Sequence, residues 1–311
     1  MTLLLRSLKV PKLLNINKRP FCTRQNKDFS LEPVNLAYAT YEGTLTLENN
    51  PHPLIIMHGL FGSKSNWNTL CKVFQQKTNP QRKIIAVDAR NHGDSPHDPH
   101  HSYELLALDL KDFLENLGLE KASILGHSMG GRAAMLFALK YPKLVEKLIV
   151  VDISPISTSP DISLMPVYMR ALQSLNIPSN LTLSRARLAA DLQLNESGMK
   201  DKGLRAFLLT NLIQKQDGSF DWRINLQALL MNLDNIKRFP YEKGTTFEGP
   251  TLFIGGTASD YIRRSDIPEI KKIFPNSDIQ YIEGAGHWLH SEKPTEFLQI
   301  SLEFLNRQLT S

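Results

Sequence analysis

Ser123-Ile124-Leu125-Gly126-His127-Ser128-Met129-Gly130-Gly131 is the stretch of sequence that decides the fold. Residues 121–125 are mostly apolar and too few for a helical period, so they predict a short buried strand. Residues 132–140 are good helix formers and stop at Tyr141-Pro142, where a helix must end. A Gly-x-Ser-x-Gly turn between a strand and a helix needs glycines on both sides of the serine, because side chains there would clash. We therefore predict that Ser128 is a nucleophile whose hydroxyl stands above the sheet.

Composition excludes several classes of protein. The chain has 311 residues, of which 41% are hydrophobic and 22% charged, as in an ordinary globular protein with a sizeable core. No run of eighteen apolar residues predicts a membrane-spanning helix. The two cysteines, Cys22 and Cys71, give neither a disulfide framework nor metal-ligand spacing.

The net charge of +5 belongs to the N-terminus. Residues 1–28 hold seven basic residues and one acidic residue and contribute +6, so the rest of the chain carries about −1. This distribution argues against a nucleic-acid surface on the folded body. A basic, leucine-rich and acid-poor N-terminus, with Arg19-Pro-Phe-Cys22 resembling a processing site, is typical of mitochondrial transit peptides. We predict that residues 1–28 are a transit peptide and that the mature protein lies in mitochondria, in the matrix.

Apolar stretches alternate with helical ones along most of the chain. Five further stretches are short and apolar, like strands buried on both faces of a parallel sheet: 53–57, 83–87, 145–151, 251–255 and 278–282. This alternation predicts the α/β class, with a doubly wound and mostly parallel sheet. An alternating stretch over 36–46 adds a predicted hairpin.

Residues 155–247 break that alternation. Several prolines precede helix-like stretches there, and no buried strand is evident. We predict one α/β domain over residues 29–311, with a core formed by 29–154 and 248–311 and a helical cap, 155–247, inserted between them.

A serine hydroxyl is a poor nucleophile at neutral pH and needs a base to take its proton. His287 is the candidate base, because it lies in a glycine-rich loop after the last predicted strand, at the same edge of the sheet as Ser128. An acid must accept a hydrogen bond from the imidazole to fix its tautomer. Asp152 and Asp260 both follow strands whose loops reach this edge, so spacing alone does not choose between them.

Two backbone N–H groups near the serine are candidates for an oxyanion hole. Met129 follows the nucleophile at the start of the helix, and Leu60 lies in the glycine-rich loop 58–63. His58 is interpreted as a local brace of that loop rather than as a base. The histidines at 97, 100 and 101 lie among prolines in a segment interpreted as a solvated loop, so no metal site is predicted.

Five motifs together resemble the α/β-hydrolase superfamily: His58-Gly-Leu-Phe-Gly-Ser63, Asp88-Ala-Arg-Asn-His-Gly93, Gly126-His-Ser-Met-Gly-Gly131, Val151-Asp-Ile-Ser-Pro155 and Gly284-Ala-Gly-His-Trp288. The resemblance covers roughly residues 35–305 and is closest to a branch that contains small bacterial esterases. It implies the α/β-hydrolase fold, with the acid directly after the strand that follows the predicted helix 132–140. That acid is Asp152. The later loop of that branch typically reads Gly-Gly-x-Ser-x-Tyr, and a one-residue insertion here leaves Asp260 where the family usually has no acid. The family also implies ester hydrolysis, no cofactor and, for eukaryotic members, mitochondrial residence.

Together these features predict a serine carboxylic-ester hydrolase of the esterase or lipase type, which acts on a small acyl ester such as an acylglycerol through an acyl-enzyme. An acyltransferase would use the same three residues with another acceptor in place of water. A ligand-binding or interaction protein on the same fold is a third alternative, disfavoured because all three residues are present. Apolar cap residues such as Met165, Val167, Tyr168 and Met169 could contact substrate or a lipid surface, or could pack on the core.

Overall fold

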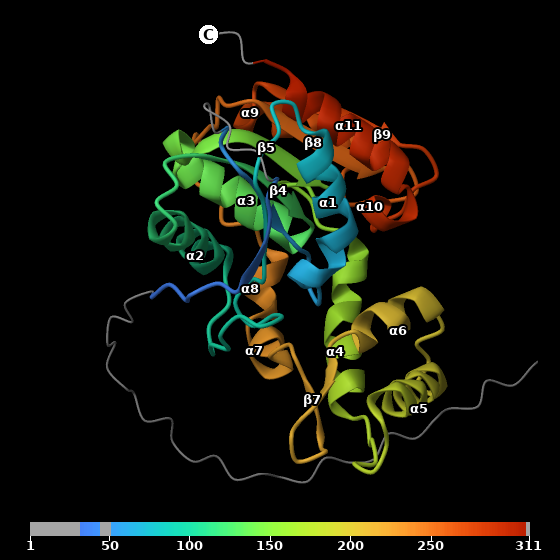
Figure 1. Cartoon of the computed structure of the whole chain (residues 1–311). Coiled ribbons are helices and arrows are strands. Elements are labelled where there is room, and N and C mark those ends of the chain that lie inside the picture. The colour runs from blue at the N-terminus through green and yellow to red at the C-terminus, as the bar shows by residue number, and fades with distance from the viewer. Residues whose placement is uncertain (1–31, 44–50, 309–311) are drawn as a thin grey trace, which may run out of the picture. The chain divides into compact units, whose positions relative to one another are not determined.

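Seven strands form one sheet within the residues that this computed structural model describes, 32–43 and 51–308 (Figure 1). In spatial order they are β1 (Tyr38–Tyr41), β3 (Ile84–Val87), β2 (Leu54–Met57), β4 (Ala122–His127), β5 (Val145–Val151), β8 (Thr251–Gly256) and β9 (Ser277–Ile282). Every neighbouring pair is parallel except β1 with β3. The predicted doubly wound, mostly parallel sheet is confirmed.

Two predictions concern residues outside the described ranges. The predicted transit peptide, 1–28, lies wholly outside them. The predicted hairpin over 36–46 lies partly outside them, and its described strand, β1, pairs with β3.

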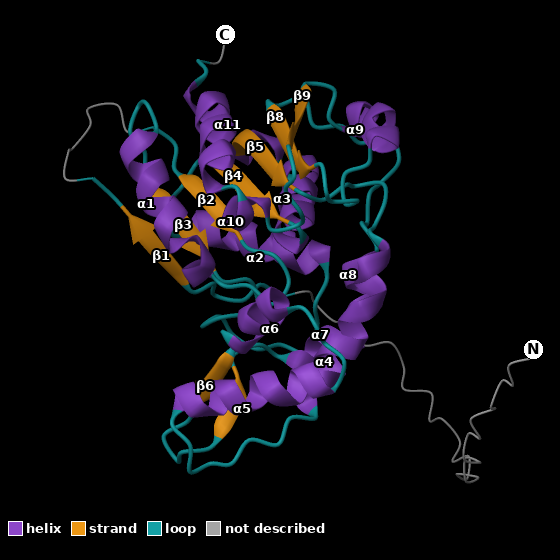
Figure 2. Ribbon diagram, turned by 90° about the vertical axis from the view of Figure 1, so that its right-hand side faces the viewer, coloured by secondary structure: helices purple, strands orange, loops and turns teal. Residues whose placement is uncertain are grey.

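Helices cover both faces of the sheet (Figure 2). On one face lie α2 (Tyr103–Asn116), α3 (Met129–Lys140) and α9 (Ile267–Ile273); on the other lie α1 (Asn68–Lys77), α10 (Leu289–Glu292) and α11 (Pro294–Asn306). Alternate residues of a strand point to opposite faces, so Ile55 packs with the first group of helices and Ile56 with the second. Burial on both sides explains why β2 and β3 are apolar throughout.

The chain between β5 and β8 forms the cap, which has its own apolar core that includes Met169, Leu208 and Leu229. Its elements are η3 (Pro160–Leu164), α4 (Met165–Gln173), α5 (Leu183–Glu196), α6 (Lys202–Leu209), β6 (Leu212–Gln214), β7 (Phe220–Trp222), α7 (Leu226–Met231) and α8 (Leu233–Lys237). Besides the predicted helices, the cap contains one antiparallel strand pair, β6 with β7, which the sequence did not indicate. Each has three residues, too few to show a strand period in the sequence.

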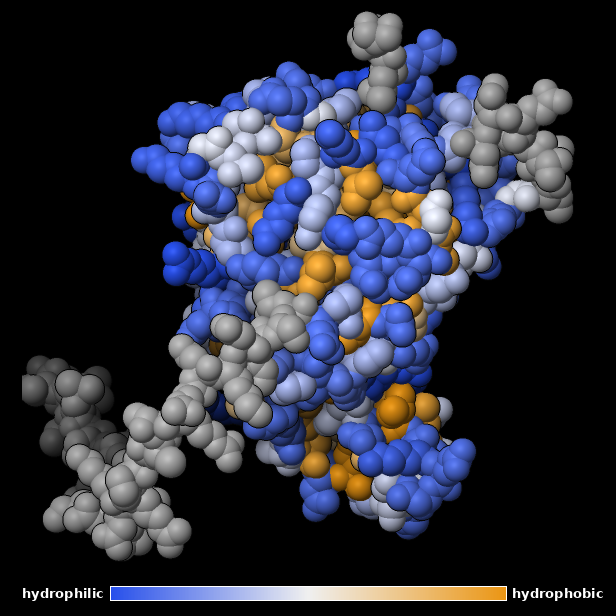
Figure 3. Space-filling view, turned by 90° about the vertical axis from the view of Figure 1, so that its left-hand side faces the viewer, coloured by the Kyte–Doolittle hydropathy of each residue, from blue (hydrophilic) through white to orange (hydrophobic). Residues whose placement is uncertain are grey.

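Large exposed apolar side chains gather in the cap. Of the seven among the described residues, six lie within 155–247: Ile156, Leu164, Val167, Leu188, Leu192 and Met231. Figure 3 shows apolar areas on one face of the molecule, one of them on the cap, low in the view. No helix in the described part of the chain is both long enough and apolar enough to cross a bilayer.

Candidate active site

Ser128 occupies the sharp turn between β4 and α3. Its backbone angles, φ 54° and ψ −117°, are unfavourable for a residue with a side chain. The Ser128 N–H donates to the carbonyl oxygen of Val151 at 2.9 Å and so ties the turn to β5. A Cβ on Gly126 would lie 2.2 Å from the carbonyl oxygen of Gly130, so only glycine fits there. The turn therefore has the strained geometry that holds a serine hydroxyl outward.

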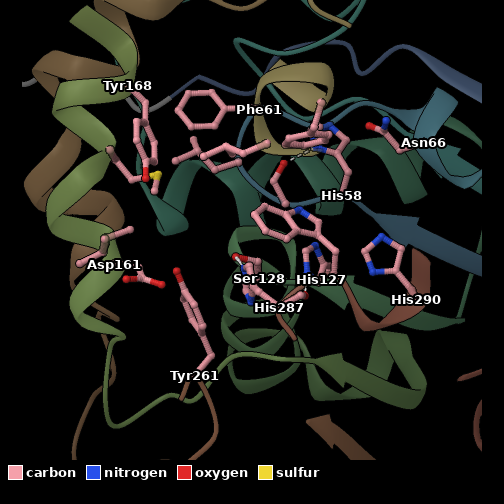
Figure 4. Close-up of a pocket in the computed structure, with 18 of the residues that line it drawn as sticks. His58, Phe61, Asn66, His127, Ser128, Asp161, Tyr168, Tyr261, His287 and His290 are labelled. Atoms are coloured by element: carbon pink, nitrogen blue, oxygen red, sulfur yellow. Dashed lines mark hydrogen bonds between the residues drawn. The ribbon is translucent and has the colours of Figure 1, made fainter. Parts of the chain in front are cut away.

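His287 lies in the loop after β9, with its Nε2 3.0 Å from Oγ of Ser128 (Figure 4). Its Nδ1 lies 2.7 Å from Oδ2 of Asp152, a fully buried carboxyl group at the end of β5. An ionised carboxylate can only accept, so Nδ1 carries the proton and Nε2 is left to accept one from the Ser128 hydroxyl. The structure thus joins the three predicted residues in one hydrogen-bonded chain.

Asp152, and not Asp260, contacts the histidine. The Asp152 carboxylate also accepts from the hydroxyl of Ser259 and, at 3.2 Å, from the N–H of Gly256. Asp260 is about half exposed, and its nearest charged partner is Arg263, at 3.9 Å. The insertion in the 255–261 loop therefore leaves Asp260 on the surface.

The loop after β2 presents the second predicted oxyanion donor. The carbonyl oxygen of Gly59 accepts from the N–H of Gly62 at 2.9 Å and from Nδ1 of His58 at 2.8 Å. Because the two ends of a peptide plane point in opposite directions, this fixes the Leu60 N–H on the other side. Within the described residues, neither the Leu60 N–H nor the Met129 N–H donates to a protein acceptor, so both remain available to a ligand.

Buried histidines brace the site. His58 donates through Nδ1 to the carbonyl oxygen of Gly59 and accepts the Ala89 N–H at Nε2 over 3.0 Å. It therefore stabilises the loop locally, as predicted. Burial lowers its pKa and keeps it neutral. The expectation of a solvated loop is wrong for His101, which is 1% exposed and whose pKa burial lowers to about 3. His101 packs against the ring of His92, a contact that no sequence spacing revealed.

Two residues near His287 were not predicted to act there. The ring of Tyr261 is stacked on the imidazole, with centroids 3.8 Å apart and planes at 18°. The Glu292 carboxylate accepts the N–H groups on either side of His287, from Gly286 at 2.6 Å and from Trp288 at 3.3 Å. Tyr261 matches the tyrosine of the Gly-Gly-x-Ser-x-Tyr loop pattern in the branch that this sequence resembles. No sequence signal pointed to Glu292.

A cavity of about 240 Å³ opens over Ser128, as Figure 4 shows. The cap supplies much of its apolar wall, including Met165, Tyr168 and Phe207. Of the four cap residues whose role the sequence left open, Met165 and Tyr168 line this cavity, Met169 is buried in the apolar core of the cap and Val167 is exposed. A second cavity of about 420 Å³ adjoins the first and shares Phe207 and Trp288 as wall residues. Within the described ranges, no group of three or more His, Cys, Asp or Glu side chains is arranged to hold a metal ion.

Comparisons with known proteins agree with this site. The family model described as the alpha/beta hydrolase fold matches residues 52–294. The sn-1-specific diacylglycerol lipase ABHD11 of Danio rerio is 46% identical over 273 residues, covering 88% of this chain and 83% of that protein. Esterase YbfF of Escherichia coli is 32% identical over 259 residues, covering 83% and 95%. The solved structure of a marine microorganism esterase has 38% identity and a TM-score of 0.79, covering 87% of this chain and 99% of that one. The resemblance drawn from the five motifs is confirmed, and the chain belongs to the α/β-hydrolase family.

Proposed function

We propose that this protein is a serine carboxylic-ester hydrolase that acts through an acyl-enzyme. The observation that carries the proposal is the hydrogen-bonded chain from Ser128 through His287 to Asp152 at the base of a largely apolar cavity. The similarity to a lipase and to esterases over most of the chain supports the same reaction class.

In the first half of the reaction, Ser128 Oγ attacks the ester carbonyl carbon while Nε2 of His287 takes the hydroxyl proton. The carbonyl π electrons move to oxygen, and the N–H groups of Leu60 and Met129 stabilise the negative charge that forms. Asp152 stabilises the imidazolium and holds it in place. The electrons then return, the C–O bond to the alcohol breaks, and His287 protonates the leaving oxygen.

In the second half, a water molecule attacks the acyl-Ser128 ester. His287 accepts one proton from that water and passes it to Ser128 Oγ as the tetrahedral intermediate collapses. The products are a carboxylic acid and an alcohol, and the enzyme returns to its starting state. These steps are written without a metal or an organic cofactor.

For the substrate we propose an acylglycerol or another neutral acyl ester. The apolar wall formed by Met165, Tyr168 and Phe207 suits an acyl chain. The name of the Danio rerio relative, a diacylglycerol lipase, points to the same class of ester.

The test uses a fluorophosphonate probe and p-nitrophenyl esters on the purified protein and on Ser128→Ala. Wild-type protein should be labelled and should hydrolyse the ester, and Ser128→Ala should do neither. Ser163→Ala is the matched control, because Ser163 is an exposed serine of the cap outside the hydrogen-bonded chain. Absence of labelling in well-folded wild-type protein would favour the ligand-binding or interaction reading.

The acyltransferase alternative is separated by adding an alcohol to the same assay. Hydrolysis predicts that free acid is the main product at all alcohol concentrations that the protein tolerates. Transfer predicts that the new ester replaces the acid and that total turnover rises with the alcohol.

We propose further that the cap contacts a lipid surface. Leu188 and Leu192 are 63% and 55% exposed, and a spacing of four residues puts them on one side of α5. Replacing both with serine should reduce co-sedimentation with vesicles of neutral and anionic phospholipid. Tyr38→Ser removes an exposed apolar side chain outside the cap and should leave sedimentation unchanged.

Mitochondrial targeting by residues 1–28 is also a proposal, supported by the basic and leucine-rich composition of that segment. The segment fused to a fluorescent protein should direct it to mitochondria. A fusion in which Arg6, Lys9 and Lys12 are replaced with glutamate should stay in the cytosol.

A further inference from the structure

The oxyanion loop contains a strained residue that is held from two sides. Phe61, next to the oxyanion donor Leu60, has a φ of 63°, which is unfavourable for a residue with a side chain. Such a conformation persists only where the surroundings hold it. The Phe61 side chain is 3% exposed and packs in the apolar core of the cap, although the residue belongs to the loop after β2.

The core holds the Phe61 N–H. This group donates to Nε2 of His92 over 3.2 Å, and Nδ1 of His92 lies 3.0 Å from the carbonyl oxygen of Arg90. A carbonyl oxygen accepts only, so Nδ1 carries the ring proton and Nε2 is the acceptor. Burial keeps the pKa of His92 well below its usual value, so the ring is neutral and keeps this role.

The cap holds the Phe61 carbonyl. Nδ2 of Asn211 donates to it over 2.8 Å, across 150 residues of sequence. The same nitrogen also donates to the carbonyl oxygen of Leu208 at 3.2 Å. Because both partners are carbonyl oxygens, the amide nitrogen must face them, which fixes the orientation of the side chain. Asn211 is 2% exposed, so water does not compete for this bond.

We infer that Asn211 is a positioning residue for the oxyanion hole and that the hole is complete only when the cap is seated on the core. The inference rests on the proposed ester hydrolysis. Without the Asn211 amide, the Phe61 peptide is held only from the core side. The N–H of the same peptide plane, that of Gly62, donates to the Gly59 carbonyl that orients the Leu60 N–H. If this plane turns, Gly59 keeps only the bond from His58, and the Leu60 N–H leaves the place where the oxyanion forms. A molecule whose cap has lifted would have the hydrogen-bonded Ser128 and His287 but a single oxyanion donor.

The test compares Asn211→Leu with Asn225→Leu. Asn225 is the matched control, since its Nδ2 also bridges cap and core, to Oδ1 of Asn91 at 3.1 Å, without touching Phe61. Loss of a whole oxyanion donor costs about 10²–10³ in kcat, so its displacement should cost about 10- to 100-fold. Asn211→Leu should lower kcat by that factor with KM nearly unchanged, and Asn225→Leu should change kcat less than about threefold.

Two further measurements separate positioning from general damage. A trifluoromethyl ketone forms a tetrahedral adduct with an oxyanion, so its inhibition should weaken in Asn211→Leu by a factor close to that in kcat. Hydrogen exchange of the peptide spanning residues 58–62 should speed up in Asn211→Leu and not in Asn225→Leu, whether or not either protein is active. If Asn211→Leu has a lower thermal unfolding midpoint than Asn225→Leu, the same measurements are made on Asn211→Ser instead.

Each outcome decides a separate point. Wild-type kcat and ketone inhibition in Asn211→Leu, or equal losses in both asparagine variants, would overturn the inference. If wild-type protein hydrolyses no ester, the proposed function fails, and the exchange comparison alone then supports or refutes the positioning role.

Discussion

The replacement of Asp152 with asparagine should nearly abolish turnover without unfolding the protein. Three donors converge on this carboxylate: Nδ1–H of His287, the hydroxyl of Ser259 and the N–H of Gly256. An amide of the same shape has one accepting oxygen, and its NH₂ group would face at least one of these donors. If the NH₂ faces His287, the imidazole must place its proton on Nε2, where it can no longer accept one from Ser128.

The size of the effect follows from that wrong tautomer. In the well-studied serine triad, the same substitution lowers kcat by about 10⁴-fold, which corresponds to about 5 kcal/mol of activation free energy. Asp152 is fully buried, so bulk water cannot replace the lost acceptor. Asp260→Asn is the matched control and should change kcat less than about threefold, because that side chain is half exposed and its contact with Arg263 is loose.

The assay is the steady-state hydrolysis of a p-nitrophenyl ester at neutral pH, with thermal unfolding of each variant as a check on folding. The assignment of the acid would be wrong if Asp152→Asn kept more than about a tenth of wild-type kcat. A loss of more than about a hundredfold in Asp260→Asn would be equally damaging, since it would move the acid to the later loop.

Three further predictions concern the elbow, the aromatic stack and the buried histidines. Gly126→Ala puts a Cβ 2.2 Å from a backbone oxygen and should lower the free energy of unfolding by at least about 3 kcal/mol. Urea denaturation measures this, and an unchanged midpoint would show that the turn can relax. Tyr261→Leu removes the ring stacked on His287 and should lower kcat about 3- to 10-fold. Tyr261→Phe keeps the ring and should have a kcat near that of wild type. Equal losses of kcat in both variants would mean that the hydroxyl, and not the ring, supports turnover. Burial lowers the pKa values of His101 and His290 to about 3, below the unfolded value of about 6.5, so the unfolded state binds more protons as the pH falls. Stability should therefore drop by about 1.4 kcal/mol per histidine between about pH 7.5 and about pH 5.5, and a flat denaturation profile over that range would contradict it.

The sequence was most informative where one residue type is the only one that fits. Glycine is required at 126 by a turn whose atoms lie within a few residues of each other, and this turn marks the serine at 128. Burial on both faces likewise makes the central strands β2 and β3 apolar throughout, so local patterning found them. These features depend on neighbours in the chain, and for that reason the sheet and the nucleophile could be predicted.

Contacts between distant segments could not be predicted in the same way. Spacing alone left Asp152 and Asp260 open, and the family resemblance implied Asp152. The fold shows that the Asp152 carboxylate is the one that reaches His287. Glu292 and Asn211 are ordinary polar residues in the sequence. Asn211 contacts a loop 150 residues away in the chain, and Glu292 contacts the loop that turns back beside it. The short strands β6 and β7 escaped detection because three residues carry almost no periodic signal.

Backbone strain gives a common reason why these distant contacts gather at one edge of the sheet. Four non-glycine residues of the described chain have positive φ: Phe61, Asn91, Ser128 and Asp152. Ser128 and Asp152 belong to the hydrogen-bonded chain at the cavity, Phe61 follows Leu60, the proposed oxyanion donor, and Asn91 directly precedes His92. Each such conformation costs about 1–3 kcal/mol, so contacts from other segments must offset it. Phe61 and Asn91 both hydrogen-bond to asparagines of the cap, which means that the cap stabilises strained backbone of the core as well as lining the cavity. A cap exchanged from another family member would therefore have to supply the asparagine at 211 to hold the oxyanion loop, and not merely a wall of suitable shape. The asparagine at 225 would be needed for the stabilising contact with Asn91 rather than for turnover.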